Sequence, residues 1–199
     1  MKRVLHPRGM LLLTAGCFAA LAVAVLLAGA HPADAAARDG VLSLASPVVV
    51  AIMRVVTRLG HAWFLVPATL LLFVIFPEAR ARWWVWGGLM LVAPVAESTF
   101  KFLIGRPRPF DPSYGFPSGH ATAAAAFFGA VIYLAGSLPP RARRLVRLLS
   151  GVAIVLVALS RVMLRAHWPS DVLGGVALGL FLASAAALLA RPPQRAVRG

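Results

Sequence analysis

Two residues near the C-terminal end of the chain have the types and spacing for nucleophilic catalysis. His167 and Asp171 are four residues apart, which places both side chains on one face of a helical turn. A carboxylate that accepts a hydrogen bond from one imidazole nitrogen orients the ring and leaves the other nitrogen free to attack. Pro169 suits the first helical turn, where its missing N–H costs nothing. We therefore expect His167 to be the nucleophile and Asp171 its orienting group.

A second segment, Pro117-Ser118-Gly119-His120, leads directly into an apolar run that we expect to be helical. Free N–H groups and the positive end of the dipole make a helix N-terminus an anion site. Gly119 lets the backbone approach an anion closely. An ordinary turn and helix cap is the alternative, but His120 and the basic residues that face it favour anion binding.

Three cations, Lys101, Arg108 and Arg161, lie at the ends of three expected helices. Phosphoryl transfer depends mainly on positioning and on charge stabilisation. Three cations and helix N–H groups can surround one phosphoryl group, whereas the nearby carboxylates are too few and too widely spaced for a two-metal site. The sequence therefore predicts a phosphate pocket without a metal or a cofactor.

The composition places these segments in a membrane. The 199 residues are 60% hydrophobic and 13% charged, and the mean hydropathy is +0.84, which leaves too little charge for a water-soluble surface. We expect one membrane-embedded domain over residues 1–199. The net charge of +14 is spread in short clusters between apolar runs, so it predicts membrane orientation and no nucleic-acid partner. The single Cys17 offers no disulfide framework.

Six apolar runs approach the 17 to 25 residues, roughly, that cross a bilayer. We expect an all-α bundle of six transmembrane helices, at about residues 10–30, 58–76, 83–101, 120–136, 148–164 and 171–190. Twelve of the 20 Lys and Arg residues lie on one side of this arrangement, and the positive-inside rule makes that side cytoplasmic. Both termini are then cytoplasmic, and the candidate site lies at the outward helix ends.

The three segments read, in order, Lys101-x6-Arg108-Pro109, Pro117-Ser118-Gly119-His120 and Ser160-Arg161-x5-His167-x3-Asp171. This arrangement resembles the three-part signature of the type 2 phosphatidic acid phosphatase (lipid phosphate phosphatase) superfamily at every position and spacing. The resemblance implies a bacterial inner-membrane enzyme that works without a metal and through a phosphohistidine. His167 would attack phosphorus, Asp171 would orient it and His120 would protonate the leaving oxygen. The phosphate would be bound by Lys101, Arg108, Ser118, Gly119 and Arg161.

The expected substrate is a lipid phosphate in the bilayer: undecaprenyl diphosphate, phosphatidate, phosphatidylglycerol phosphate or a lipid A phosphate. No motif selects among them. A lipid-to-lipid phosphotransferase would use the same site, and a lipid transporter or a vanadate-dependent oxidase are more distant alternatives. The oligomeric state is left open.

Four charged residues near the signature have less defined roles. Arg106 and Arg165 either contact a second phosphate or headgroup or lie at the lipid surface. Glu97 precedes Lys101 by four residues, which predicts an ion pair within one helix. Asp111 has no assigned role.

Two questions concern the N-terminal third of the chain. The first apolar run is either a retained helix, which its length favours, or a signal peptide cleaved near Ala33-Asp34-Ala35. Residues 41–57 are apolar all round except for Arg54, with Arg58 one turn further on. This stretch is either an interfacial helix on the outer leaflet or the start of a long second helix.

Overall fold

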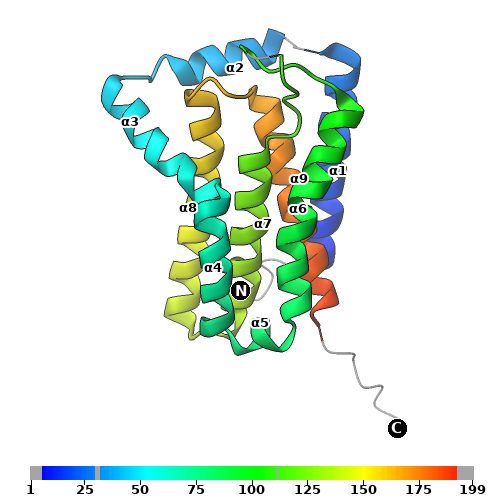
Figure 1. The fold of residues 1–199 in the computed structure, drawn as a ribbon, viewed down its shortest axis with the longest axis vertical. Coiled ribbons are helices and arrows are strands. Elements are labelled where there is room, and N and C mark those ends of the chain that lie inside the picture. Colours follow the sequence, from blue (N-terminus) through cyan, green and yellow to red (C-terminus); the bar gives the residue numbers. More distant parts are fainter. Residues whose placement is uncertain (1–5, 30–31, 111, 192–199) are drawn as a thin grey trace.

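Among the residues that the structure describes, five helices are long and apolar enough to cross a membrane, and the bent pair Pro32–Leu42 and Pro47–Gly60 would be a sixth if it formed one span. The computed structural model describes residues 6–29, 32–110 and 112–191, and its long helices run side by side in a bundle (Figure 1). They are α1 (Pro7–Ala28), α6 (Trp83–Ile104), α7 (Gly119–Leu134), α8 (Pro140–Met163) and α9 (Pro169–Leu189). The expectation of an all-α membrane fold is therefore confirmed, with five of the six spans.

The shorter elements connect these helices. They are α2 (Pro32–Leu42), α3 (Pro47–Val56), the 3₁₀ turn η1 (Thr57–Gly60), α4 (Ala62–Ile75), α5 (Pro77–Ala81) and the 3₁₀ turn η2 (Ala135–Ser137). We call the end of the bundle where α6 and α8 end and α7 and α9 begin the site end. Helix α2 crosses this end of the bundle, and α5 lies at the opposite end (Figure 1).

The second expected span differs from the prediction. The chain is extended at His61, which separates η1 from α4, and α4 has 14 residues, or about 21 Å of helix against a hydrocarbon core of about 30 Å. Helix α3 is a separate element that starts at Pro47, where Ser46 Oγ accepts the N–H of Val49. Residues 41–57 are therefore not the continuous start of a long second helix.

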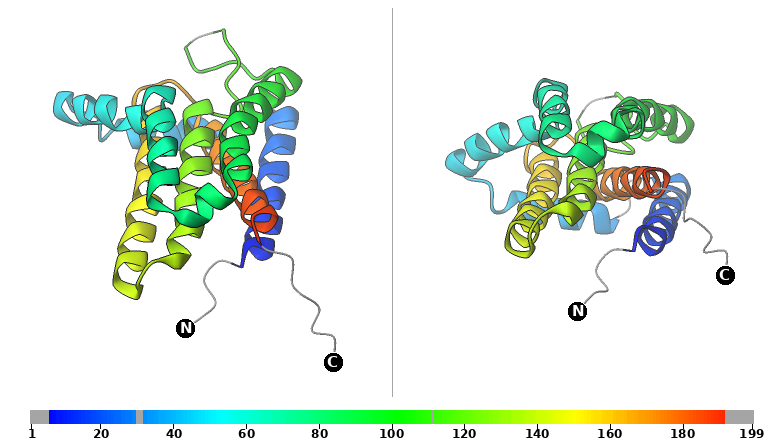
Figure 2. Two further views of the ribbon diagram at one scale, coloured as in Figure 1. Left: turned by 60° about the horizontal axis from the view of Figure 1, so that its bottom comes forward. Right: turned by 90° about the horizontal axis from the view of Figure 1, so that it is seen from below.

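Helix α7 lies in the middle of the bundle and packs closely against α9 (Figure 2). A Cβ added at Gly129 would lie 2.8 Å from Ala183 Cβ, and one at Gly175 would lie 2.6 Å from the carbonyl oxygen of Ser118. Small residues let helix backbones approach in a bilayer, where burial of apolar surface gives little net drive. Gly175 thus lets the first turn of α7 lie close to the start of α9, and Gly129 allows the same close approach further along both helices.

Helix α1 covers the other side of α9. Phe18 of α1 packs edge-on against Phe100 of α6, with ring centroids 4.7 Å apart, and stacks on Phe116, at 5.8 Å. Phe116 is fully buried, just before the Pro117-Ser118 segment. Helix α1 thus supports the loop that leads into α7.

Candidate active site

His167 and Asp171 meet at the site end, as their spacing predicts. His167 lies in the short connection between α8 and α9, and Asp171 lies in the first turn of α9; their exposed fractions are 1% and 0%. His167 Nδ1 is 3.5 Å from Asp171 Oδ2, a distance suited to an ionic contact and long for a strong hydrogen bond. With Nδ1 turned to the carboxylate, Nε2 lies on the opposite side of the ring.

Both oxygens of Asp171 have hydrogen-bond donors. The N–H of Trp168 donates to Oδ2 at 3.0 Å, and Arg106 Nη1 donates to Oδ1 at 2.8 Å. The first of these bonds caps α9, whose first residue is Pro169, so the carboxylate is part of the helix start. The orientation of Asp171 is consequently fixed by its own helix and by Arg106.

A tight turn after α8 places the histidine. Arg165 has a φ of 58°, a left-handed conformation that costs a non-glycine residue about 1 to 2 kcal/mol. The N–H groups of Ala166 and His167 both donate to the carbonyl oxygen of Arg161, at 3.0 and 3.3 Å. This turn directs His167 inwards, while the side chain of Arg165 is exposed.

The segment before α7 is attached to the same place. The N–H of Ser118 donates to the carbonyl oxygen of Asp171 at 2.9 Å, so the N-terminus of α7 lies beside His167 and Asp171. Ser118 Oγ is buried and has no hydrogen-bond partner among the residues that the structure describes. A buried hydroxyl without a protein partner, at a helix N-terminus, is placed to donate a hydrogen bond to an anion.

His120 lies one residue into α7 and faces other cations. Its ring centroid is 5.7 Å from that of His61, and the charges of Arg161, His167 and Lys101 all act on it electrostatically. The two histidines that the signature assigns to catalysis therefore share one site.

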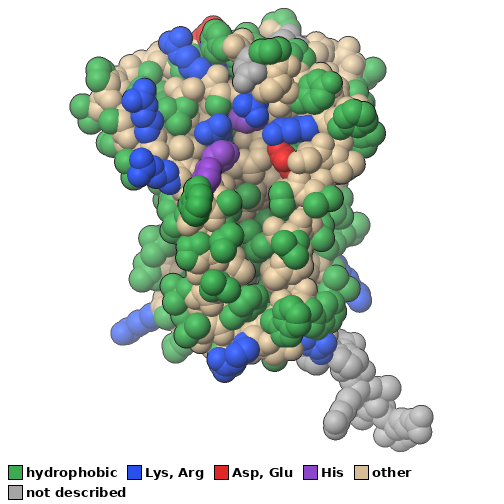
Figure 3. Space-filling view, in the orientation of Figure 1, with side chains coloured by type: hydrophobic (Ala, Val, Ile, Leu, Met, Phe, Trp, Pro, Cys, Tyr) green, Lys and Arg blue, Asp and Glu red, His purple; other side chains and the backbone are tan. Residues whose placement is uncertain are grey.

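The predicted phosphate-binding cations come from three different parts of the chain. Lys101 at the end of α6 pairs with Glu97, which confirms the expected ion pair. Arg161 at the end of α8 donates from Nη1 to Thr57 Oγ1 at 3.0 Å, and its buried Nε finds no partner within the described part of the chain. Arg108 donates from Nε to the carbonyl oxygen of Tyr114 at 3.2 Å. Figure 3 shows cationic and histidine side chains gathered near the site end, above an apolar face.

Besides pairing with Lys101, the Glu97 carboxylate lies against the first turn of α7. A Cβ added at Gly119 would be 2.8 Å from Glu97 Oε1. The lack of a side chain at Gly119 thus makes space for the Glu97 carboxylate, which pairs with Lys101. This role is separate from the close approach of an anion that the sequence predicted for Gly119.

The surroundings of His167 keep its imidazole neutral. Burial lowers the pKa of His167 below its ordinary value of 6.5. The hydrogen bond and the charge of Asp171 raise this pKa, and the charges of Arg161 and Arg108 lower it. A neutral imidazole is the form that can act as a nucleophile.

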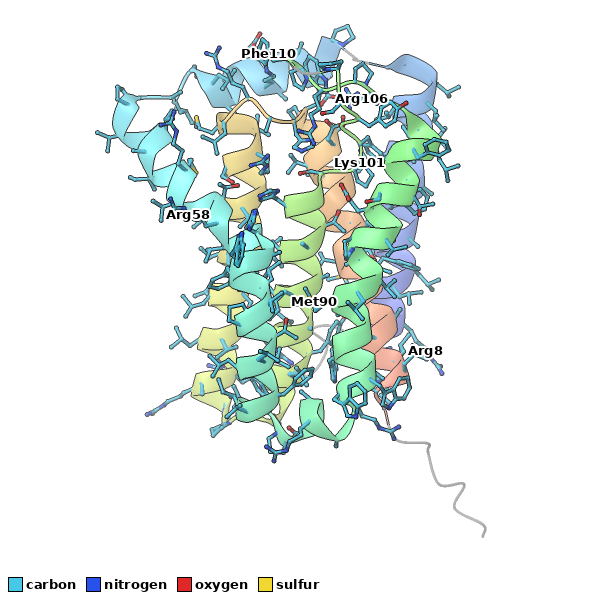
Figure 4. The ribbon with its side chains drawn as sticks, viewed as in Figure 1. Arg8, Arg58, Met90, Lys101, Arg106 and Phe110 are labelled. Carbon is cyan, nitrogen blue, oxygen red and sulfur yellow. The ribbon has the colours of Figure 1, made fainter. Side chains whose placement is uncertain are left out.

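Arg106 was predicted to contact a headgroup or to lie at the lipid surface, but in the structure its side chain is buried. Its exposed fraction is 4%, and it bonds to Asp171, to Ser170 and to Asp34 of α2. Figure 4 shows Arg106 and Lys101 near the site end and Arg8 towards the opposite end. The sequence around Arg106 could not predict its buried ion pair with Asp34, because the two residues are 72 positions apart.

Three residues beside the site carry no mark in the sequence: Asp34, Thr57 and His61. Each lies in a segment outside the signature, and only the fold brings it to Arg106, Arg161 or His120. Asp111 lies outside the described residues. No group of three His, Cys, Asp or Glu side chains that could hold a metal ion occurs among those that the structure describes.

Comparisons with known proteins point to one family. A model of the PAP2 superfamily matches residues 82–194. Phosphatidylglycerophosphatase B of Bacillus subtilis is 33% identical over 83% of this chain and 87% of its own length. Decaprenylphosphoryl-5-phosphoribose phosphatase of Mycobacterium tuberculosis is 36% identical over 53% of this chain and 60% of its own. The crystal structure of a transmembrane PAP2-type phosphatidylglycerolphosphate phosphatase from B. subtilis superposes with a TM-score of 0.78, at 29% identity, over 92% of this chain and 94% of that one.

Proposed function

The chain belongs to the PAP2 superfamily and is a membrane lipid phosphatase, and from this premise we propose that it hydrolyses its lipid phosphate through a phosphohistidine on His167. The observation that carries the proposal is the position of His167, oriented by Asp171 and surrounded by cations. Ser118 and the N-terminus of α7 lie beside it. The site thus combines a nucleophile, its orienting group and an anion pocket.

The reaction divides between the two histidines. Neutral His167 forms a bond from Nε2 to phosphorus, and the bond from phosphorus to the leaving oxygen breaks. The negative charge of the bound substrate favours the charged form of His120, which then gives its proton to that oxygen. A water oxygen then bonds to phosphorus, the bond from phosphorus to Nε2 of His167 breaks, and the water proton goes to His120, which releases inorganic phosphate and restores the free enzyme.

The remaining groups stabilise the phosphoryl charge during both steps. Lys101, Arg108 and Arg161 supply positive charge. Ser118 Oγ and the N–H groups at the start of α7, with Gly119, supply hydrogen bonds. These donors are fixed by helix ends before the substrate arrives, so little reorganisation accompanies the reaction.

A groove between α4 and α6 gives the lipid chain a route to this pocket. The volume of this groove is about 510 Å³. Ala62 of α4 lies at one end, next to His61, and Ala123 of α7, one turn after His120, forms part of its wall. Apolar residues of α4 and α6 line the rest. An acyl or prenyl chain in this groove would place its phosphate at the site end.

The distribution of charge supports an outward-facing site. Arginines at the opposite end include Arg80 of α5 and four in the first two turns of α8, at positions 141, 143, 144 and 147. By the positive-inside rule this end is cytoplasmic. The substrate would then be a phosphomonoester or diphosphate lipid of the outer leaflet of a bacterial inner membrane.

Among lipid phosphates, phosphatidylglycerol phosphate is the first to test, because the B. subtilis relative named for it aligns over most of both chains. Undecaprenyl diphosphate, phosphatidate and lipid A phosphates complete the panel. A phosphotransferase would instead move labelled phosphate to a second lipid, which thin-layer separation distinguishes from released inorganic phosphate.

The direct test is phosphate release by the purified protein in detergent, with EDTA present throughout. We expect His167→Ala and His120→Ala each to abolish release from every lipid that the wild type hydrolyses, while the proteins stay folded. His6→Ala, which removes an exposed histidine before α1, is the matched control and should retain activity. Full activity in either of the first two variants, or loss of wild-type activity in EDTA, would contradict the mechanism.

A further inference from the structure

A buried cluster of charges links α2 to the catalytic carboxylate. Arg106 lies between two acids: its Nη2 is 2.5 Å from Asp34 Oδ2, and its Nη1 is 2.8 Å from Asp171 Oδ1. The exposed side-chain fractions of Arg106, Asp34 and Asp171 are 3%, 8% and 0%. Asp34 is the buried residue of α2. This carboxylate gives α2 a buried polar contact with the bundle, beside the apolar packing of Val41 against α7, α8 and α9.

Ser170 completes the cluster. Its N–H donates to Asp34 Oδ1 at 2.8 Å, and its hydroxyl contacts Asp34 Oδ2. Arg106 Nη1 also lies 2.5 Å from Ser170 Oγ. Asp34 thus bonds both to the arginine that holds Asp171 and to the residue that precedes Asp171. Two independent connections fix the same catalytic group.

Charge balance gives Asp34 a second effect. Arg106 is buried, so its field is weakly screened. Without Asp34, the positive charge of Arg106 would offset the negative charge of Asp171 and weaken the attraction between this carboxylate and His167. A second carboxylate on the far side of the guanidinium offsets this field, and a buried charge deprived of its partner is costly. Asp34 therefore preserves the electrostatic attraction of Asp171 for the His167 imidazole.

We propose that Asp34 and Arg106 are positioning residues that hold the Asp171 carboxylate towards His167, which makes α2 part of the catalytic framework. The inference rests on the proposed function, because it requires His167 and Asp171 to act in the reaction. Asp34 lies outside the three signature segments and outside residues 82–194, which the family model matches.

The first experiment removes the charge of Asp34 and keeps its shape. We expect Asp34→Asn to lower kcat by about 10- to 100-fold, the effect of a slightly misplaced catalytic group, with little change in KM. Asp39→Asn changes an exposed carboxylate of the same helix and should keep wild-type kinetics. Size-exclusion profiles and unfolding temperatures in detergent establish that both variants are folded.

The pH profile separates this role from a merely structural one. Four charged or titratable groups act electrostatically on His167. They are Asp171 of α9, Arg161 of α8, Arg108 of the loop before α7 and His120 of α7. In Asp34→Asn the uncompensated charge of Arg106 disfavours protonation of His167. The acid limb of kcat/KM should move to lower pH, whereas a change in folding alone would lower the whole profile without moving the limb.

A second background tests whether Asp34 acts through Arg106. In Arg106→Gln, the further change Asp34→Asn should leave the acid limb where it is. Arg106→Lys keeps the charge but cannot bridge both carboxylates in the same way, so kcat should fall while the limb stays. This variant also keeps the proposal testable if Asp34→Asn does not fold.

The outcomes distinguish the positioning role from the function on which it rests. Wild-type kcat and an unmoved acid limb in Asp34→Asn, together with an inactive His167→Ala, would overturn the positioning role alone. An equal shift of the limb by Asp34→Asn with and without Arg106 would do the same. An active His167→Ala would instead overturn the proposed function.

Discussion

His167 lies between one carboxylate and several cations, and the balance among them sets its protonation. Asp171 favours the imidazolium, whereas burial, Arg161 and Arg108 favour the neutral ring, and the pKa of His167 is lowered overall. Proton binding would remove the lone pair with which His167 is proposed to attack phosphorus. Activity that depends on neutral His167 should therefore be lost only when the pH falls through the lowered pKa of this residue, which lies below the ordinary histidine value of 6.5.

This balance predicts a shift in the pH profile when a cation is removed. Arg108→Gln deletes a charge that lowers the pKa of His167, so the acid limb of kcat/KM should move to higher pH than in the wild type. Comparing the two enzymes on one substrate cancels the titration of the substrate phosphate. An acid limb at the same pH or lower in the variant would contradict the assignment of His167.

Gly119 carries a second prediction at the residue scale. The methyl group of Gly119→Ala would lie 2.8 Å from Glu97 Oε1, which forces Glu97 away and moves its partner Lys101. We expect kcat/KM for lipid phosphate to fall about 10-fold, which corresponds to about 1.4 kcal/mol. Gly9→Ala, where an added Cβ meets nothing within 4 Å, is the control. Unchanged kinetics in Gly119→Ala would show that the Glu97–Lys101 pair is not positioned by this contact.

Local spacing explains which residues of the site could be predicted. His167 and Asp171, like Glu97 and Lys101, are four residues apart, so the sequence predicted both contacts. The contact of Asp34 with Arg106 depends on how α2 crosses the bundle. No short-range pattern records it, and Arg106 was consequently interpreted as a headgroup or surface residue.

At the scale of elements, the break at His61 decides how the second membrane helix is built. The sequence predicted one span over 58–76, because the apolar run that begins at Ala62 was extended upstream by one turn. In the structure His61 is extended and its Nδ1 accepts the N–H of Trp63, which starts a new helix. This break brings the His61 ring close to His120.

The groove between α4 and α6 predicts where a bulky side chain would block the lipid. Gly88 lines it, and a Cβ added there meets nothing within 4 Å, so Gly88→Phe should fold and fill the groove. We expect KM for a long-chain lipid phosphate to rise at least about 10-fold, because the loss of two buried CH₂ groups already costs about 1.6 kcal/mol. Hydrolysis of a short-chain, water-soluble analogue should be unaffected.

Gly16→Phe on α1 is the matched control, since its position is exposed and also open. An equal effect of Gly88→Phe on long and short substrates would indicate damage to the site and not obstruction of the groove. No effect on either substrate would exclude the groove as the route of the chain.

At the scale of the whole molecule, α1 is a structural part of the bundle. It packs along α9, and Phe18 supports Phe116 beside the start of α7. Hydropathy and flanking charge could not distinguish a signal peptide from a retained helix, because both share a basic start and an apolar run. Packing against α9 is a tertiary property, and it favours retention.

We therefore predict that the mature protein keeps the segment up to and including Ala35. A cut there would remove Asp34, whose carboxylate bonds to Arg106 and Ser170, together with the helix that covers α9. The intact mass of protein purified from bacterial membranes should include this segment, and a variant that begins at residue 36 should lose phosphate release. A mature chain that starts at residue 36 with full activity would refute the prediction and would also remove Asp34 from the catalytic framework.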